Sequence, residues 1–201
     1  MVAKTKPWAW LVLSFLILAA NCIQHCVHGK PQLRCLYIFG DSYSDNGNNN
    51  DLLTSAKSNY LPYGIDFPQG PTGRFTNGKT AIDQIAELLG IQNFPPPFAN
   101  STDSFVPEGL NYASGAAGIL FETGKHRVRR HEEVFNRLAS KIGGPKKAKQ
   151  HLKKCLYYLN IGTNDYIGNY FLPQFYDTSS TYTLEQYANI LIEEYSTYIQ
   201  G

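Results

Sequence analysis

Short apolar runs alternate with amphipathic stretches along the chain. Residues 36–39 form a continuous apolar run that ends at Gly40, and residues 155–161 form a second run that ends at Gly162. Runs of this length are typical of strands that are buried on both faces. Residues 109–113 are long enough for a third, shorter strand.

Three segments have apolar residues at helical spacing: 80–89, 126–142 and 183–195. The middle segment has the weakest pattern and is broken by Gly and Pro at 143–145. The first and the last begin with the capping-box pattern, in which a Thr is followed three positions later by a side chain that bonds back: Thr80 with Asp83, and Thr183 with Gln186. Strands that alternate with helices predict an α/β domain with a parallel sheet.

Polar residues directly follow the two clearest strands. Gly40-Asp41-Ser42 comes after the first, and Gly162-Thr-Asn-Asp165 comes after the second. Ligands of parallel sheets bind beyond the carboxyl ends of the strands. A Ser on a sharp turn between a strand and a helix exposes its hydroxyl and its backbone N–H, as in several hydrolases. Residues 41–51 form either a loop or the start of such a helix, whose N-terminus would favour an oxyanion.

Two other features supply hydrogen-bond donors for an oxyanion. Asn164 has a side-chain amide at a strand end, and the small residues 114–118 offer a backbone N–H near Gly115. Each signal alone is weak, because a Ser after a strand is more often a helix N-cap, and an Asn in such a segment is more often a turn residue. Gly115 and Gly118 can also serve packing alone.

Composition and charge agree with one globular domain. The chain has 201 residues, of which 43% are hydrophobic and 17% charged, and a net charge of +2. Residues 125–154 hold eleven Lys or Arg against two Glu. Such a segment can bind nucleic acid, but no binding motif accompanies it, so we interpret it as a solvated face and expect no nucleic-acid partner.

The N-terminus has the pattern of a secretory signal peptide. Lys4 and Lys6 precede a mainly apolar run at residues 8–20, and polar residues follow. Thirteen residues are too few to span a bilayer, which needs roughly 20. We therefore expect a signal peptide within residues 1–29, cleaved somewhere in 20–29, and a secreted, extracellular domain at 30–201 without stable membrane insertion. The sequon at Asn100 predicts N-glycosylation on a surface loop.

Four motifs in order resemble those of the plant-type GDSL esterases/lipases, within the SGNH hydrolase superfamily. They are FGDSYSDNGNNN at 39–50, GRFTNGK at 73–79, NYASGAAGI at 111–119 and NIGTNDY at 160–166. The resemblance extends from about residue 35 to 200. It implies a three-layer α/β/α sandwich whose parallel sheet has five strands in the order 2-1-3-4-5.

The same resemblance assigns the site. Ser42 matches the nucleophile of a serine ester hydrolase, which forms an acyl-Ser42 intermediate. The N–H of Ser42, the side chain of Asn164 and a second-block glycine match the oxyanion hole; Gly115 is our first choice and Gly118 the other. The mechanism implies no cofactor, no metal and an ester substrate. The acyl length and the oligomeric state stay open.

The sequence departs from the family in three places. Tyr43 replaces the Leu of the family name, and residues 125–142 are shorter and more basic than expected. The catalytic Asp-x-x-His pair does not occur, because none of the five His lies three residues after an Asp. We therefore expect the domain to be incomplete at its C-terminus, with an uncovered strand at 155–161, and the chain as it stands to be at most feebly active. The alternative is a non-catalytic ester- or carbohydrate-binding member.

The family topology also makes neighbours of the strands that begin at Cys35 and Cys155. A disulfide between these residues is therefore a hypothesis, and two buried thiols are the alternative. Three of the five histidines, His126, His131 and His151, lie in the basic segment and are expected at the surface.

Overall fold

The structure is a computed structural model that describes residues 33–200 apart from 92, 103, 122 and 124–129. The expected signal peptide, its cleavage region and His126 lie outside the described residues. The elements in order are β1 (Leu36–Gly40), α2 (Ala81–Leu88), the 3-10 turn η1 (Phe98–Asn100), α3 (Arg130–Ile142), α4 (Pro145–Leu152), β2 (Leu156–Asn160), α5 (Thr163–Asp165), the π-helical turn η3 (Tyr166–Tyr170), α6 (Thr178–Thr181) and α7 (Leu184–Gln200).

β1 is the centre of a parallel arrangement. It pairs with β2 in a register that sets Leu36 opposite Leu156 and Gly40 opposite Asn160. An extended segment at residues 108–114 runs beside β1 as well, since the N–H groups of Leu36 and Ile38 donate to residues 108 and 110. This segment forms the expected short strand in its hydrogen bonds, although only isolated bridges join it. Counted along the chain, β1 is the first strand, residues 108–114 the second and β2 the third. Their spatial order is therefore 2-1-3, as the family topology implied.

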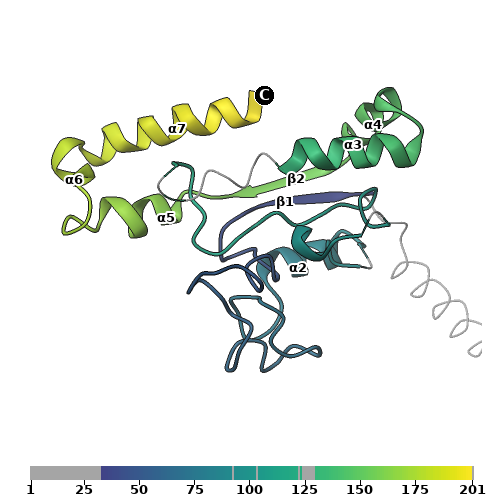
Figure 1. Ribbon diagram of the computed structural model, residues 1–201, viewed down its shortest axis with the longest axis horizontal. Helices are drawn as coiled ribbons and strands as arrows, with labels where there is room; N and C mark the ends of the chain where they lie inside the picture. Colours follow the sequence, from purple (N-terminus) through teal and green to yellow (C-terminus); the bar gives the residue numbers. More distant parts are fainter. Residues whose placement is uncertain (1–32, 92, 103, 122, 124–129, 201) are drawn as a thin grey trace, which may run out of the picture. The chain divides into compact units, whose positions relative to one another are not determined.

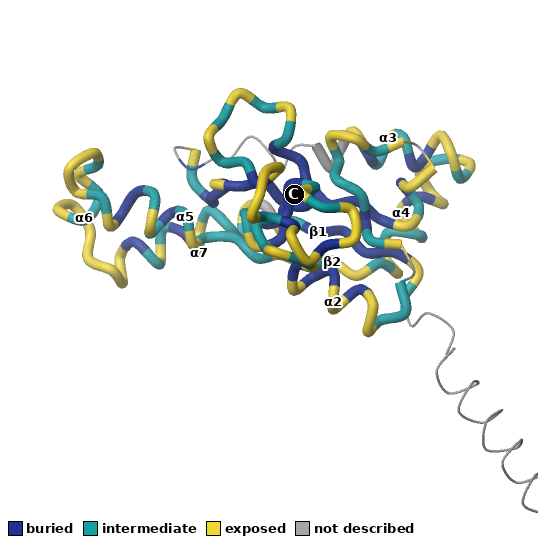
Figure 2. The backbone as a smooth tube through the Cα atoms, turned by 90° about the horizontal axis from the view of Figure 1, so that it is seen from below, coloured by how far each residue is buried: buried dark blue, intermediate teal, exposed yellow. Residues whose placement is uncertain are grey.

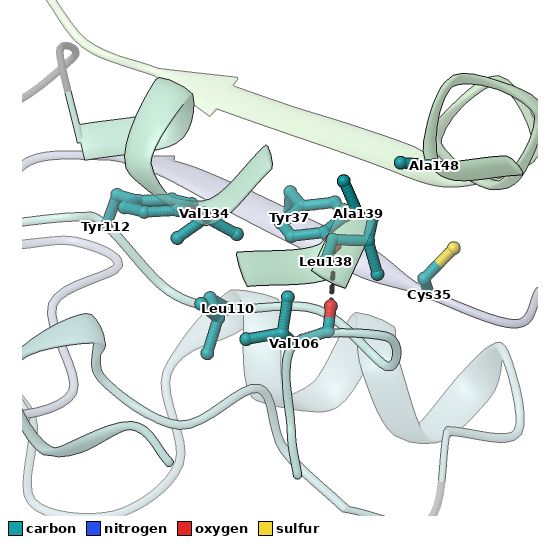
Figure 3. Close-up of a cluster of buried hydrophobic side chains, with 9 residues drawn as sticks. All are labelled: Cys35, Tyr37, Val106, Leu110, Tyr112, Val134, Leu138, Ala139 and Ala148. Carbon is teal, nitrogen blue, oxygen red and sulfur yellow. Dashed lines mark hydrogen bonds between the residues drawn. The ribbon is translucent and has the colours of Figure 1, made fainter. Parts of the chain in front are cut away.

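The two faces of β1 are covered by different helices, which gives three layers (Figure 1). Tyr37 packs with residues of α3 and α4, and its hydroxyl donates to the Val106 carbonyl at 2.6 Å (Figure 3). Leu36 and Ile38 pack with Ile82 of α2 on the opposite face. Alternate side chains of a strand point to opposite faces, so one short strand supplies both clusters. Figure 2 shows the buried backbone around β1.

The strand β2 is covered on fewer sides than β1. Leu156, Tyr157 and Leu159 are between 36% and 40% exposed, whereas the apolar residues of β1 are buried or nearly so. In the described chain β2 is therefore the exposed edge that the sequence predicted. Helix α7 is not apolar enough to cross a membrane, and the same is true of every other helix in the described residues.

Helix α2 begins at a buried capping box, as predicted. The Thr80 hydroxyl accepts from the Asp83 N–H at 3.2 Å, and Asp83 accepts from the Thr80 N–H at 2.8 Å. Arg74 of the GRFTNGK motif holds the same carboxylate with two hydrogen bonds at 2.7 and 3.1 Å. The ion pair is buried, so the 73–79 motif anchors its loop to the start of α2. Gly90, at φ 78°, ends the helix.

One prediction for local structure needs correction. Residues 143–145 end α3 as expected, but Pro145 also begins α4, which the sequence did not predict; Pro is suited to the first helical turn because it needs no N–H there. Residues 41–51 form turns, which is the loop alternative that the sequence left open beside a helix start. The Asp45 carboxylate bonds the N–H groups of Gly47 and Asn48, both at 2.8 Å, and this side-chain bonding competes with helix formation.

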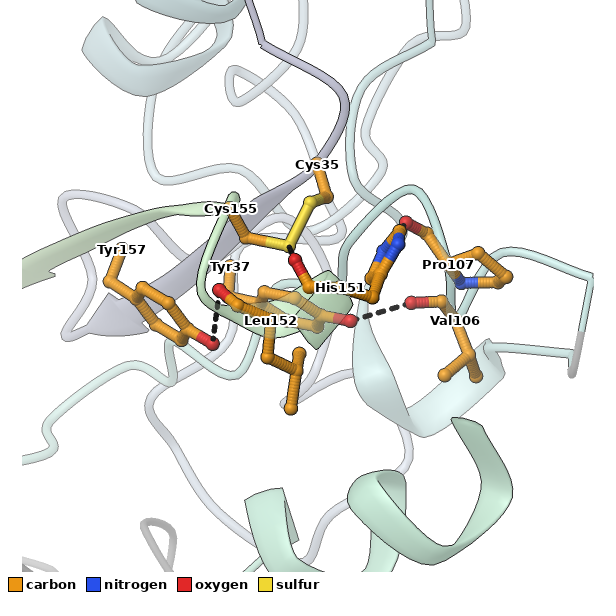
Figure 4. The surroundings of a disulfide bond; sticks show 8 residues. All are labelled: Cys35, Tyr37, Val106, Pro107, His151, Leu152, Cys155 and Tyr157. Carbon is orange, nitrogen blue, oxygen red and sulfur yellow. Dashed lines mark hydrogen bonds between the residues drawn. A yellow bond between two sulfur atoms is a disulfide. The ribbon is translucent and has the colours of Figure 1, made fainter. Parts of the chain in front are cut away.

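A disulfide joins Cys35 to Cys155, which confirms the hypothesis from the family topology (Figure 4). Their Cα atoms are 4.8 Å apart at the amino ends of β1 and β2. His151 lies beside the bond, and its ring Nε2 is 2.8 Å from the Pro107 carbonyl. His151 is thus half-buried rather than a free surface residue.

Loss of the disulfide is expected to lower the stability of the native protein. The bond spans 120 residues, so removing it in Cys35→Ala/Cys155→Ala should cost about 2–5 kcal/mol of unfolding free energy. Urea unfolding followed by circular dichroism measures this. Reductant should lower the unfolding midpoint of the wild type and have no effect on that of the double variant. A double variant whose midpoint, without reductant, equals that of the oxidised wild type would contradict the prediction.

The two capping boxes are expected to differ in strength. Thr80→Ala should destabilise by about 1–2 kcal/mol, because it removes a cap in a buried network. Thr183→Ala, at the exposed box before α7, should cost about 0.5 kcal/mol. Thermal unfolding compares the two, with Thr80→Ser as the control that keeps the hydroxyl. Equal losses at both positions would show that burial adds nothing to the cap.

Candidate active site

Ser42 lies on the turn that follows β1. It is half-exposed, and within the described residues neither its hydroxyl nor its backbone N–H has a hydrogen-bond partner. Asp41 fixes the turn, because its buried carboxylate accepts from the Tyr43 N–H at 3.0 Å and its carbonyl accepts from Ser44 and Asp45. Burial raises the pKa of Asp41, and the nearby carboxylate of Asp165 raises it further.

The motif at residues 111–119, called the second motif from here on, is bound to this turn by side chains of both segments. The Asn111 amide donates to the Ser44 carbonyl at 2.6 Å. Asp45 accepts from the Gly115 N–H at 2.8 Å, and Asn49 donates to the Gly115 carbonyl at 3.0 Å. Both backbone groups of Gly115 are therefore held by residues of the Ser42 turn.

The glycines of the second motif have no room for a side chain. A Cβ on Gly115 would come within 2.5 Å of the Phe75 ring, and one on Gly118 within 2.2 Å of the Thr123 hydroxyl oxygen. Their N–H groups are also occupied, by Asp45 at Gly115 and by the Thr123 carbonyl at Gly118. The close contacts and the occupied N–H groups fit the packing interpretation of both glycines.

Asn164 belongs to the motif at residues 160–166, and its side chain contacts the second motif. It follows β2, and its side-chain nitrogen donates to the Ala117 carbonyl at 2.8 Å. The register that sets Gly40 opposite Asn160 brings Ser42 and Asn164 to the same edge of the sheet. The structure thus gathers the Ser42 turn, the 114–118 segment and Asn164, as the sequence predicted.

Asp165 is a site residue that sequence reasoning passed over. Its carboxylate is fully buried and accepts from the N–H groups of Ile119 at 2.8 Å and Leu120 at 3.0 Å, and from the Thr123 hydroxyl. Its own carbonyl accepts from the Tyr187 hydroxyl of α7 at 2.9 Å. Asp165 therefore holds the segment after the second motif against the Asn164 turn. Its signal in the sequence was an acidic residue with no basic neighbour.

Among the described residues, the potential metal ligands that lie close together are Cys35, His151 and Cys155, and they are at the amino end of the sheet, away from Ser42. The two sulfurs are bonded to each other, so they do not serve as thiolate ligands. The side chain of His131 is outside the description. The lysines of α4 are exposed, which agrees with the interpretation of the basic segment as a solvated face.

Known proteins resemble this chain over nearly its whole described length. The profile of the family GDSL-like Lipase/Acylhydrolase matches residues 36–201. Three relatives from Arabidopsis thaliana illustrate the similarity. GDSL esterase/lipase At1g29670 is 47% identical, and the match covers 86% of this chain and 50% of the relative. GDSL esterase/lipase At1g29660 is 43% identical over 92% of this chain and 53% of the relative, and GDSL esterase/lipase At4g30140 is 45% identical over 99% of this chain and 57% of the relative.

The chain spans about half the length of the curated relatives it matches. The match nevertheless includes every motif that the structure gathers at the carboxyl edge of the sheet, from the Ser42 turn to Asn164. The parallel sheet between helices agrees with the α/β sandwich of such a domain. The chain therefore belongs to the plant-type GDSL esterase/lipase family.

Proposed function

We propose that the native protein hydrolyses carboxylic esters with Ser42 as its nucleophile. The observation that carries this proposal is the position of Ser42 at the carboxyl edge of the sheet, with its hydroxyl and N–H unpartnered in the described chain. The family supports the reaction class, since its relatives are esterases and lipases.

The reaction proceeds by acyl transfer. The Ser42 oxygen bonds to the ester carbonyl carbon while its proton passes to a general base, and the carbonyl oxygen becomes an oxyanion. Collapse of this intermediate breaks the bond to the alcohol, which leaves with the proton, and water then releases the acid from the acyl-Ser42 ester. The base is an imidazole by chemical class. We place none among the described residues, because His151 lies at the opposite end of the sheet.

Asn164 is proposed as one donor to the oxyanion. Its amide nitrogen carries two hydrogens, and in the described chain only the bond to the Ala117 carbonyl occupies it. That bond also holds the amide in place, so the second hydrogen needs no reorganisation to meet a charge that develops near Ser42. The backbone N–H of Ser42 is the other donor, and it comes from the turn that follows β1.

Secretion and glycosylation belong to the same proposal. Asn100 is exposed at the end of η1, where a glycan would meet no packed core. The disulfide between Cys35 and Cys155 is typical of proteins that mature in an oxidising compartment. Both features support a secreted glycoprotein, in keeping with the signal-peptide pattern of the sequence.

Removal of the nucleophile is expected to abolish ester hydrolysis. Ser42→Ala in the native protein should lower kcat for p-nitrophenyl acetate and butyrate by about 10⁶, the order seen when a serine nucleophile is lost. Ser44→Ala is the matched control, because Ser44 is two residues away, buried, and without a hydroxyl partner. A folded native protein that neither hydrolyses these esters nor reacts with a fluorophosphonate would instead be the non-catalytic ester-binding member.

Removal of the Asn164 amide should slow the reaction without abolishing it. We expect Asn164→Ala to lower kcat by about 10²–10³, the effect of losing one oxyanion donor. The control is Asn160→Ala at the end of β2, whose amide donates to the Tyr158 hydroxyl at 3.2 Å. Steady-state kinetics separate the two; an Asn164→Ala effect confined to KM would refute a role in the transition state.

A further inference from the structure

A cluster of potential metal ligands lies at the amino end of the sheet, whereas Ser42 follows the carboxyl end of β1. The Sγ atoms of Cys35 and Cys155 and a ring nitrogen of His151 all lie within 4.8 Å of one another. Cys35 directly precedes β1, Cys155 directly precedes β2, and His151 is in the last turn of α4 (Figure 4). In the oxidised protein the two sulfurs are joined as a disulfide, and reduction turns them into two thiols beside an imidazole.

The His151 ring is held in an orientation suited to a metal ligand. Its Nε2 is 2.8 Å from the Pro107 carbonyl oxygen. Because a carbonyl can only accept, Nε2 carries the proton, and in the neutral ring Nδ1 then keeps the lone pair that a metal requires. Metal-ligating histidines almost always donate their other N–H in this way, which fixes both the tautomer and the direction of the ring.

The three side chains are held together by the backbone as well as by the disulfide. His151 and Cys155 are separated by three residues, a spacing found between ligands of structural zinc sites. The Cys155 N–H donates to the Leu152 carbonyl at 3.1 Å, which closes the turn between them. Cys35, 120 residues earlier, lies beside this turn because its carbonyl accepts from the Leu156 N–H at 3.0 Å. Opening the S–S bond therefore leaves the ligand set assembled.

The chemistry of the cluster selects the metal. Among the described residues it consists of two sulfurs and one imidazole, without a carboxylate. Thiolate and imidazole ligands suit Zn²⁺, whereas Mg²⁺ and Ca²⁺ prefer oxygen. Cys35 is buried in the cluster around Tyr37, and a thiolate in apolar surroundings is unfavourable unless a cation neutralises it.

We propose that the reduced protein binds Zn²⁺ through the sulfurs of Cys35 and Cys155 and Nδ1 of His151. A dithiol supplies the two electrons and two protons that open the S–S bond, and is itself oxidised to a disulfide. Zn²⁺ then displaces the two thiol protons and forms two Zn–S bonds and one Zn–N bond, with water as the fourth ligand. The metal takes the place of the disulfide as the link between the amino ends of β1 and β2. This inference does not depend on the role of Ser42.

A cobalt and zinc titration of the native protein tests the proposal. Every sample carries Cys22→Ser and Cys26→Ser, because these cysteines are close in sequence to His25 and His28 and offer competing ligands. The disulfide is reduced with a phosphine, which ends as the phosphine oxide with oxygen from water, and the reagent is removed under nitrogen. We expect one Co²⁺ per chain, with a thiolate-to-metal band in the near ultraviolet and the visible bands of a tetrahedral site. Zn²⁺ should displace it, and the oxidised protein should bind neither ion.

A conservative variant separates a built site from reactive thiols alone. His151→Gln keeps an amide that can donate to the Pro107 carbonyl but removes the imidazole. It should weaken Co²⁺ binding by more than about 10²-fold, because even the partners of ligating histidines contribute about 10–100-fold. Lys153→Gln is the control, since this side chain is exposed and two residues away, and it should bind as the wild type does. Equal affinity in His151→Gln and the wild type would overturn the proposal.

Urea unfolding covers the case in which reduction loosens the fold. Zn²⁺ should raise the midpoint of the reduced protein, or refold it where reduction alone unfolds it, because a metal that binds only the folded state stabilises that state. His151→Gln should lose this effect, and the oxidised protein should not show it. A reduced protein whose midpoint is the same with Zn²⁺ and with chelator has no zinc site at this end of the sheet.

Discussion

The site depends on the position of β1 between two parallel partners. Residues 108–114 bond one edge of this short strand and β2 bonds the other, so three segments that are far apart in sequence end at one edge. Each segment continues into a turn that carries one part of the site: Ser42, the second motif, or Asn164. The strand is short, but both of its faces are buried under helices and a disulfide joins its amino end to that of β2. A shift of register by one residue would turn every side chain to the wrong face and separate the three turns.

Buried carboxylates hold the loops of the site by accepting hydrogen bonds from backbone N–H groups. Asp45 and Asp165 are fully buried, and each carboxylate accepts hydrogen bonds from backbone N–H groups. A buried carboxylate is costly unless it is hydrogen-bonded, so the loops must keep these N–H groups in place. Asp41 is the exception, because one of its oxygens has no partner in the structure and burial raises its pKa. The rigidity of the turns follows from this requirement.

Much of this arrangement was predictable, because it rests on local patterns. The capping boxes at Thr80 and Thr183, the two apolar strands and the position of Ser42 after β1 follow from short-range sequence signals. The sequence missed α4, because Pro145 follows the end of one helix and also begins the next. It left loop and helix start open for the residues after Ser42, and the structure has turns there because Asp45 bonds the backbone N–H groups. The Cys35–Cys155 pairing needed the strand order, which the family resemblance supplied and spacing alone did not.

By itself the sequence determined the family, the parallel α/β architecture and the residues that gather around Ser42, because these depend on motifs and on the period of apolar residues. Only the tertiary structure decided which backbone donors are available. Gly115 and Ala116 are adjacent and small, and the sequence favoured the glycine. In the fold, Asp45, seventy residues earlier, accepts from the Gly115 N–H, whereas the Ala116 N–H has no partner among the described residues. A hydrogen-bond donor is free or occupied according to partners from distant segments, and no local pattern encodes that distinction.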